Sequence, residues 1–267
     1  MEELLVQSAA LYAREAGELV AGLMNKPYGI QQKVNRSDLV TEADVSSEKL
    51  LRGRIGRDYP DHWILSEESD GANDPFGVCE EPPAGYGWII DPIDGTINFI
   101  HGTSHFAISI GIVKDGVPVA GVVYNPLTDE MFTARLNGGA YVNGERIQVG
   151  SEAALGDALL ATGFQASEWR PGSGVVEQIG RVVGTSRSMR IMGAASLDLC
   201  MVASGKLTGF WHGGLYPWDA AAGIVILSEA GGVVTTDEGR PYRLSDTTLV
   251  ASNRLIHDGL LGIVASV

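Results

Sequence analysis

The spacing of apolar residues predicts a helix at the start of the chain and strands in its middle. Residues 2–24 carry an apolar stripe at helical spacing, which we interpret as a packing face. Between Phe106 and Ile147 the pattern changes to short apolar runs broken by turn residues such as Asn143-Gly144, which is typical of an antiparallel meander. The helical stripe consists of Leu4, Leu5, Tyr12, Leu19, Val20 and Leu23.

Beyond about residue 153, helical and strand-like segments alternate. This alternation predicts an α/β second half. We therefore divide the chain into an N-terminal α+β half, residues 1–153, and a C-terminal α/β half, residues 154–267. The helices of the second half are expected near residues 172–183, 194–204, 219–230 and 254–264.

The segment 91–96, Asp-Pro-Ile-Asp-Gly-Thr, follows a strand-like apolar run. Pro92 has no N–H for a sheet ladder, so we expect the strand to end at Asp91. Asp91 and Asp94 then lie on either side of a bend whose ends are within about 7 Å, where they can converge on one cation, or on two cations roughly 4 Å apart. Oxygen ligands of this kind favour Mg²⁺.

The residues after Asp94 favour phosphate as the partner of such a metal. Gly95 permits close approach of the backbone, and the amides of Gly95, Thr96 and Ile97 can open a helix whose N-terminus attracts anions. A simpler interpretation of Asp94-Gly95 alone is a turn that joins two strands. The whole segment after an apolar strand favours metal-assisted phosphate chemistry instead.

Two other places in the chain offer acids at the ends of elements. Residues 63–66 form a short apolar run that ends in Glu67-Glu68, so a second strand delivers carboxylates at its C-terminal end. Asp219 precedes an apolar segment that Gly231-Gly232 stops, which indicates a buried helix. As a helix cap, Asp219 would need no further role.

These motifs resemble those of the inositol monophosphatase family of lithium-sensitive, Mg²⁺-dependent phosphomonoesterases. The resemblance rests on the Glu pair at 67–68, the segment 91–96, Trp218-Asp219 and the late Gly-Gly at 231–232, and it spans nearly the whole chain. Residues 33–44 also resemble the family stretch that supplies a loop for a third metal and a helper aspartate. Asp38 and Asp44 would otherwise serve as a turn residue and a helix cap.

The resemblance implies a layered αβαβα sandwich with two or three Mg²⁺ ions near the junction of the halves. Water on the first metal, oriented by Thr96 and Asp44, would attack phosphorus in line without a covalent enzyme intermediate. The first metal would be held by Glu67, Asp91 and the Ile93 carbonyl, the second by Asp91, Asp94 and Asp219, a third beside Glu67, and the phosphate by the amides of Gly95 and Thr96.

The substrate is expected to be a small phosphomonoester, with inositol 1-phosphate first among the candidates. The resemblance implies substrate contacts from Lys33 and Ala195, but His212 stands where the family often has an acid, and Ile97 replaces a Thr. His212 either faces the substrate or is a surface histidine. Fructose 1,6-bisphosphate, histidinol phosphate, 3′-phosphoadenosine 5′-phosphate and NADP are the alternatives.

Two rival functions are considered. A phosphatase of the haloacid-dehalogenase type also uses an Asp-rich motif, but its carboxylates lie two apart and it forms an aspartyl-phosphate. A regulatory module could instead have kept the fold and bind a protein partner such as the transcription machinery. The sequence contains no P-loop, His-Glu-x-x-His or Gly-x-Ser-x-Gly motif.

Composition adds limits on partners and location. Nineteen basic against 33 acidic residues give a formal charge of −14, which disfavours nucleic acid and anionic membranes as partners. Cys79 and Cys200 are too few for a disulfide framework, so we expect reduced thiols, although one bridge stays open. No secretory signal or membrane-length apolar run is evident, so a cytoplasmic protein is expected. Family members are commonly homodimers, which makes a homodimer the expected assembly.

Overall fold

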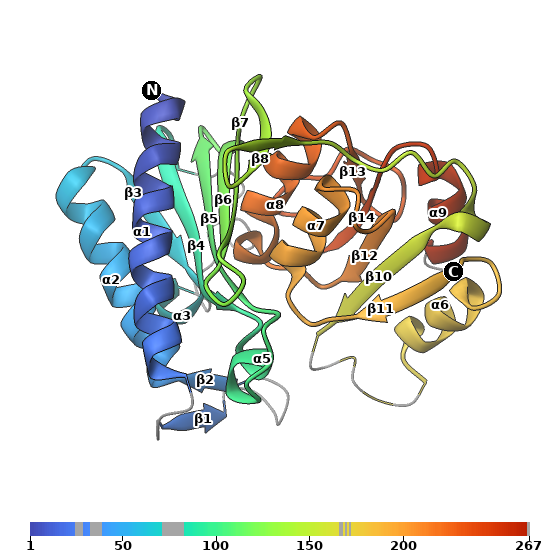
Figure 1. Cartoon of the computed structure of the whole chain (residues 1–267), viewed down its shortest axis with the longest axis horizontal. Helices are drawn as coiled ribbons and strands as arrows, with labels where there is room; N and C mark the ends of the chain where they lie inside the picture. The colour runs from blue at the N-terminus through green and yellow to red at the C-terminus, as the bar shows by residue number, and fades with distance from the viewer. Residues whose placement is uncertain are drawn as a thin grey trace.

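The computed structural model forms five layers, αβαβα, as the family resemblance predicted (Figure 1). It describes residues 1–24, 29–32, 39–70, 83–165, 168, 170 and 172–265. Helices α1 and α2 cover one face of a seven-stranded sheet, and helices α7 and α8 lie between this sheet and a five-stranded one. Helices α6 and α9 cover the outer face of the second sheet.

The outer helices of the first half pack through small and apolar residues. Helix α1 (Glu2–Leu23) buries Leu5 and Tyr12 as predicted, together with several alanines, and packs against α2 (Glu42–Asp58). The prediction that Leu4 packs in the core is wrong, since 55% of its surface is exposed. It lies one residue, or about 100°, away from Leu5 around the helix, which points it toward solvent.

The seven-stranded sheet has the strand order β3-β4-β5-β6-β7-β8-β9, and only the β3–β4 pair is parallel. The predicted meander is confirmed, because β5 to β9 follow one another as antiparallel neighbours. The strands are β3 (Trp63–Ser66), β4 (Tyr86–Asp94), β5 (Ala107–Lys114), β6 (Val117–Asn125), β7 (Glu130–Arg135), β8 (Gly139–Val142) and β9 (Glu145–Ile147). Smaller elements of this half are β1 (Ile30–Gln32), β2 (Leu39–Thr41), α3 (Glu67–Asp70) and α5 (Thr96–Ile100).

The expectation that the strand ends at Asp91 is wrong, because β4 continues through Pro92 to Asp94. The pairing of β4 with β5 shifts register between Asp91 and Asp94. A proline needs no ladder hydrogen bond within such an irregularity, so the strand survives it. The bulge leaves the two aspartates on one strand, with a local change of direction between them.

The second half alternates strands and helices as predicted. Its sheet has the order β11-β10-β12-β14-β13, with β10 parallel to both β11 and β12. The strands are β10 (Leu159–Phe164), β11 (Ser188–Ile191), β12 (Gly209–Gly213), β13 (Val233–Thr235) and β14 (Thr248–Ser252). The helices close to the four expected ranges are α6 (Gly174–Val182), α7 (Ala195–Ala203), α8 (Pro217–Glu229) and α9 (His257–Val264), and an unexpected short 3-10 helix, η2 (Leu155–Asp157), precedes β10.

Helix α8 belongs to the second half by sequence but packs directly on the first sheet. Gly111 and Gly121 are cross-strand partners on β5 and β6. A Cβ atom built on Gly111 would lie 2.5 Å from Cβ of Ala221, and one built on Gly121 would lie 2.4 Å from the carbonyl oxygen of Ala222. Two adjacent glycines therefore let α8 approach the sheet more closely than any side chain would allow.

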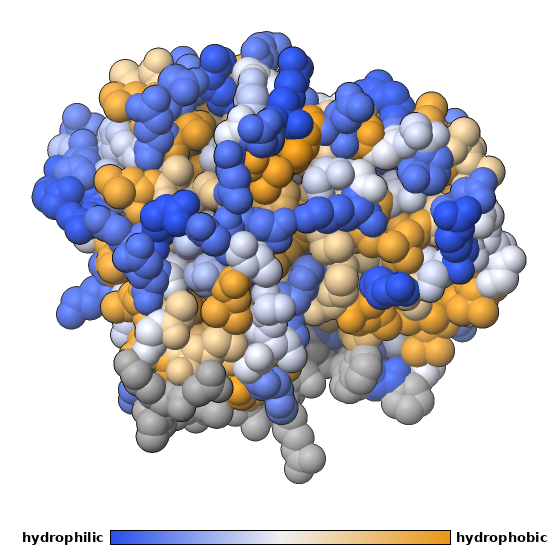
Figure 2. Space-filling model, viewed as in Figure 1, coloured by the Kyte–Doolittle hydropathy of each residue, from blue (hydrophilic) through white to orange (hydrophobic). Residues whose placement is uncertain are grey.

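The face of the molecule shown in Figure 2 carries a mixture of hydrophilic and apolar residues. In Figure 2 the apolar residues of the visible face form scattered groups among hydrophilic ones. Within the described ranges, no helix is long and apolar enough to cross a membrane. Cys200 is a free thiol in the core, and Cys79 lies outside the described residues.

Candidate active site

Asp91 is one of the deeply buried residues among those predicted for the site. It lies near the end of β4 with 2% of its surface exposed, and one carboxylate oxygen accepts the Ile93 N–H at 3.0 Å. Burial raises the pKa of Asp91 well above its usual range, and the nearby acids raise it further. The four largest charge effects on it all come from carboxylates, those of Glu67, Asp94, Asp219 and Glu68.

The sheet topology explains why Glu67 and Asp91 share one region. Strands β3 and β4 are parallel, and Ser66 pairs with Ile90 in their register. Both strands therefore deliver acids at the same edge of the sheet, as predicted from the two apolar runs. The Glu68 N–H donates to the Glu48 carboxylate of α2 at 3.0 Å, which fixes the start of α3.

Asp94 points toward the second half of the chain. Its carboxylate accepts the N–H of Ala195 at 3.2 Å and the N–H of Ser196 at 2.8 Å, and it also accepts the Ser196 hydroxyl. These donors belong to the first turn of α7, whose N-terminus stabilises a negative charge. Burial raises the pKa of Asp94 to about 6, although the Ser196 hydrogen bonds lower it.

Asp219 is the third residue of α8, and its carboxylate accepts the Tyr216 N–H at 2.8 Å. The predicted role as a helix cap is therefore present. The same carboxylate also raises the pKa of Asp91, so the two acids are within electrostatic range of each other. Asp219 is the contribution of the second half to the acids around Asp91.

The donor set around Asp91 fits a hard cation such as Mg²⁺, because it consists of carboxylate oxygens that repel one another. As placed, however, no three or more His, Cys, Asp or Glu side chains among the described residues are grouped to hold a metal ion. The carboxylates of Asp94 and Asp219 instead accept hydrogen bonds from backbone N–H groups at helix N-termini. The assignment of the metal ligands stays a prediction.

Thr96 and Asp44 are in contact. The Thr96 hydroxyl lies 3.0 Å from an oxygen of Asp44 and 3.1 Å from the Ile93 carbonyl. Asp44 is fully buried as part of the capping box of α2, where it accepts the N–H of Thr41 at 2.8 Å and its hydroxyl at 2.6 Å. Burial raises the pKa of Asp44, and the hydrogen bonds from Thr41 and Thr96 lower it. Both interpretations of Asp44, as a helix cap and as the partner of Thr96, are thus compatible.

The turn after Asp94 has the expected form. Gly95 precedes α5 in a left-handed conformation with φ of 94°, which favours glycine. Thr96 then begins the short helix α5. The first amides of a helix have no acceptor within it, so those of Gly95 and Thr96 are available to an anion by geometry.

The three residues expected to contact substrate have different surroundings. The Ala195 amide is engaged by Asp94, as described above. His212 lines a pocket of about 140 Å³ with Glu168, Gln178 and Asp237, and this lining contains none of the predicted metal ligands. Lys33 lies outside the described residues, as does Asp38.

The imidazole of His212 is neutral at physiological pH. Its Nδ1 lies 2.7 Å from the carbonyl oxygen of Gly213, and a carbonyl can only accept, so Nδ1 carries the proton. Burial lowers the pKa of His212 to about 4. The remaining nitrogen, Nε2, is therefore an acceptor, and Gly163 provides the space beside it.

Sequence reasoning missed three polar residues that support the site. Ser196 donates to Asp94, Glu48 holds the start of α3, and the Ser47 hydroxyl donates to the Pro92 carbonyl at 3.0 Å. All three are buried polar residues on helices. Glu48 lies four residues after Asp44 on the same face of α2, and that spacing was the available signal.

Comparisons with known proteins agree with the fold. The family model for the inositol monophosphatase family matches residues 1–267. The chain is 39% identical to the inositol-1-monophosphatase of Synechocystis over 94% of this chain and 85% of that protein. Among solved structures, the IMPase of Thermotoga maritima has a TM-score of 0.87 at 33% identity, with 99% of this chain and 97% of that chain covered. The extragenic suppressor protein suhB of Bartonella henselae has a TM-score of 0.88 at 32% identity, with 98% of each chain covered.

The layered fold and these relatives define a phosphomonoesterase, which is a hydrolase. The chain belongs to the inositol monophosphatase family, whose members generally depend on metal ions. The match over the whole chain sets aside the haloacid-dehalogenase alternative.

Proposed function

We propose that this protein hydrolyses a small phosphomonoester with Mg²⁺ at the site around Asp91, and that inositol 1-phosphate is its first candidate substrate. One observation carries the proposal: the buried Asp91 carboxylate has the acids Glu67, Asp94 and Asp219 as its electrostatic neighbours. Such a concentration of negative charge would repel a phosphate ester unless cations were bound.

The proposed ligands are carried over from the family. Glu67, Asp91 and the Ile93 carbonyl would hold one ion, and Asp91, Asp94 and Asp219 would hold another. When bound, Mg²⁺ supplies charge neutralisation for the phosphate and acidifies water. To bind an ion, the carboxylates of Asp94 and Asp219 would have to share their oxygens between the ion and the helix amides that now donate hydrogen bonds to them.

Thr96 and Asp44 would hold the attacking water. A hydroxyl has one proton, and both described neighbours of the Thr96 hydroxyl, Asp44 and the Ile93 carbonyl, can only accept it. Toward the site Thr96 can therefore act only as an acceptor. A water that donates a proton to Thr96 presents a lone pair elsewhere, which suits in-line attack on phosphorus.

The leaving group is proposed to contact the second half of the chain. A phosphate held by the amides of Gly95 and Thr96 would direct its ester group toward the start of α7. His212 would accept a hydrogen bond from a substrate hydroxyl through Nε2, at the position where family members often have a charged acid. The solved relative SaIMPase-II, 32% identical over 96% of this chain, was crystallised with inositol monophosphate.

A nucleotide is the second candidate substrate, and a specific observation favours it. SaIMPase-II was also crystallised with 2′-AMP, at 31% identity over 98% of this chain. A neutral His212 adds no negative charge next to a second phosphate, which an acid at this position would. Dinucleotides and bisphosphates such as 3′-phosphoadenosine 5′-phosphate therefore belong in the same test.

The test is phosphate release by the purified protein with Mg²⁺, using myo-inositol 1-phosphate, 2′-AMP, 3′-phosphoadenosine 5′-phosphate, fructose 1,6-bisphosphate, histidinol phosphate and NADP. We expect turnover of at least one ester, its loss in EDTA and its recovery on adding Mg²⁺. An Asp91→Asn variant serves as the control, because it keeps the shape of the side chain and removes its charge. Turnover that survives in this variant, or no turnover of any ester, would contradict the proposal.

A further inference from the structure

A buried acid of α7 takes no part in the function proposed above. Asp198 lies in the first turn of the helix with a side chain that is 1% exposed, and its Oδ1 is 2.9 Å from Nε2 of His105. The His105 side chain is 24% exposed. Burial raises the pKa of Asp198, and His105 opposes this rise. A buried carboxylate needs such a partner, but the location of this pair suggests more than charge compensation.

His105 lies where three segments meet. The Asn98 side-chain nitrogen is 2.7 Å from the carbonyl oxygens of both His105 and Met192, so one amide group joins α5 to the segments before β5 and before α7. At Gly95 a Cβ atom would lie 3.0 Å from the His105 carbonyl oxygen and 3.2 Å from that of Gly193. The turn that carries the proposed phosphate amides is therefore packed against both neighbouring segments.

The first turn of α7 in turn determines where Asp94 points. Both oxygens of the Asp94 carboxylate accept hydrogen bonds from Ala195 or Ser196. A shift of this turn would rotate or release the carboxylate. Asp198 belongs to the same turn, and its bond to His105 is a side-chain tie from this turn to the chain just before β5.

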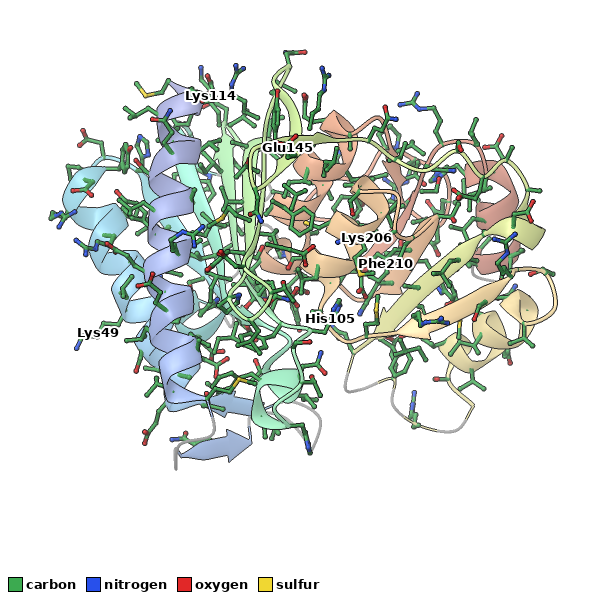
Figure 3. The ribbon with its side chains drawn as sticks, in the orientation of Figure 1. Lys49, His105, Lys114, Glu145, Lys206 and Phe210 are labelled. Carbon is green, nitrogen blue, oxygen red and sulfur yellow. The ribbon has the colours of Figure 1, made fainter. Side chains whose placement is uncertain are left out.

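An ion pair holds the other end of the same helix. Lys206 follows the C-terminus of α7, and its Nζ lies 2.6 Å from the Glu130 carboxylate of β7. Lys206 and His105 both lie between the two sheets in Figure 3. The two pairs both tie α7 to the first sheet or its connections, but only the His105 pair involves the turn that contacts Asp94.

We propose that His105 and Asp198 are a positioning pair: their hydrogen bond fixes the first turn of α7, and through it the orientation from which the Asp94 carboxylate would share an oxygen between this turn and a metal ion beside Asp91. The proposal rests on the function proposed above. His105 acts through Asp198, Ser196 and Asp94 and touches neither metal nor substrate.

Two variants that differ by one methylene test this role. In His105→Gln the side-chain nitrogen reaches the position of Nε2, whereas in His105→Asn it stops near the position of Nδ1. Both replacement side chains are polar and uncharged, so any change in the charge beside Asp198 is the same in the two variants. We expect His105→Asn to raise the Mg²⁺ concentration for half-maximal activity, and the Kd for Mg²⁺ by calorimetry, about tenfold, the low end for groups that orient metal ligands.

His105→Gln should bind Mg²⁺ like the parent protein, and so should Lys206→Met, which breaks the pair at the far end of α7. The second readout is hydrogen exchange of the Ala195 and Ser196 amides in the metal-free protein, which should be faster in His105→Asn only. Equal Mg²⁺ affinities for the Asn and Gln variants, an equal loss in Lys206→Met, or unchanged amide exchange would each overturn the positioning role.

The same experiments separate this proposal from the proposed function. If the parent protein neither binds Mg²⁺ nor releases phosphate, the function proposed above fails. The amide exchange of Ala195 and Ser196 still decides whether His105 holds the turn, because it needs no metal and no turnover.

Discussion

The two halves of the molecule contribute different things to the candidate site. The first half brings acids at strand ends, Glu67 and Asp91, and the second brings the N-termini of α7 and α8. Asp94 and Asp219 join the two, because each is an acid that accepts a hydrogen bond from the start of one of these helices. One half concentrates negative charge, and the other supplies the backbone amides that orient part of it.

Asp91 and Asp94 show this difference within one strand. Both are buried, but the neighbours of Asp91 that act on it most strongly are acids, whereas Asp94 accepts hydrogen bonds from α7. The charge of Asp91 opposes folding unless a cation is present, and that of Asp94 is partly stabilised by the fold itself. Function and stability are therefore separable at two positions three residues apart.

The largest expected effect comes from replacing each of these acids by Asn. Asp91→Asn and Asp94→Asn should both lower phosphate release by roughly 100- to 1,000-fold, as when a preorganised electrostatic partner is lost. In EDTA, Asp91→Asn should keep or raise the melting temperature, because it relieves repulsion among the acids. Burial disfavours the charge of Asp94 as well. Asp94→Asn should nevertheless be less stable than Asp91→Asn by about 1 kcal/mol, since an amide offers one acceptor oxygen to α7 instead of two.

Activity assays and thermal unfolding in EDTA check this pair of variants. Equal melting temperatures of the two variants in EDTA would show that the two aspartates do not differ in the way described.

A smaller effect is expected at Asp44, which contacts Thr41 on the side of α2 and Thr96 on the side of the site. Thr96→Val keeps the shape and should lower phosphate release about 10- to 100-fold, with little change in stability, because Asp44 retains both hydrogen bonds from Thr41. Thr41→Val should do the reverse and cost about 1 kcal/mol as a lost helix cap. Turnover numbers and denaturant unfolding of the two variants measure this contrast, which disappears if both lose activity and stability alike.

The smallest effect at neutral pH belongs to His212. Its folded pKa of about 4 lies below the ordinary value of 6.5, so the unfolded chain binds a proton between these values and the folded one does not. The titration of His212 thus leaves the free energy of unfolding unchanged above pH 6.5. It lowers this free energy by up to roughly 3 kcal/mol as the pH falls toward 4. His212→Phe keeps a ring beside Gly163 without the titration, so it should lose less stability than the parent between pH 7 and pH 4.5. Denaturant unfolding at both pH values tests this, and equal losses would mean that the imidazole is not held neutral.

Much of this architecture follows from local sequence rules. The α1 stripe, the meander and the helices of the second half were predicted because apolar periodicity and turn residues act over short distances. Glu67 was predicted because it follows a short apolar strand, and Asp91 because it opens the motif 91–96, although β4 does not end there. The passage of β4 through Pro92 was not, since it depends on a register shift against β5 that no local signal encodes.

The orientation of the side chains within the site could not be predicted from the sequence either. The motif 91–96 indicates carboxylates that converge, but it does not indicate that Asp94 turns to α7, about a hundred residues further along the chain. The same holds for His212, whose ring is set by the carbonyl of Gly213 and the space above Gly163. Contacts of this kind arise from packing between layers, and residue types alone leave several of them open.

The glycine pair at 111 and 121 sets how far Asp219 lies from the acids of the first half. Since α8 carries Asp219 and rests on these glycines, a single added methyl group at either position would lift the helix and widen the gap that the proposed ion would have to span. Selectivity of the proposed site among cations of different radius would then be open to adjustment from inside the hydrophobic core, by residues that bear no functional group at all.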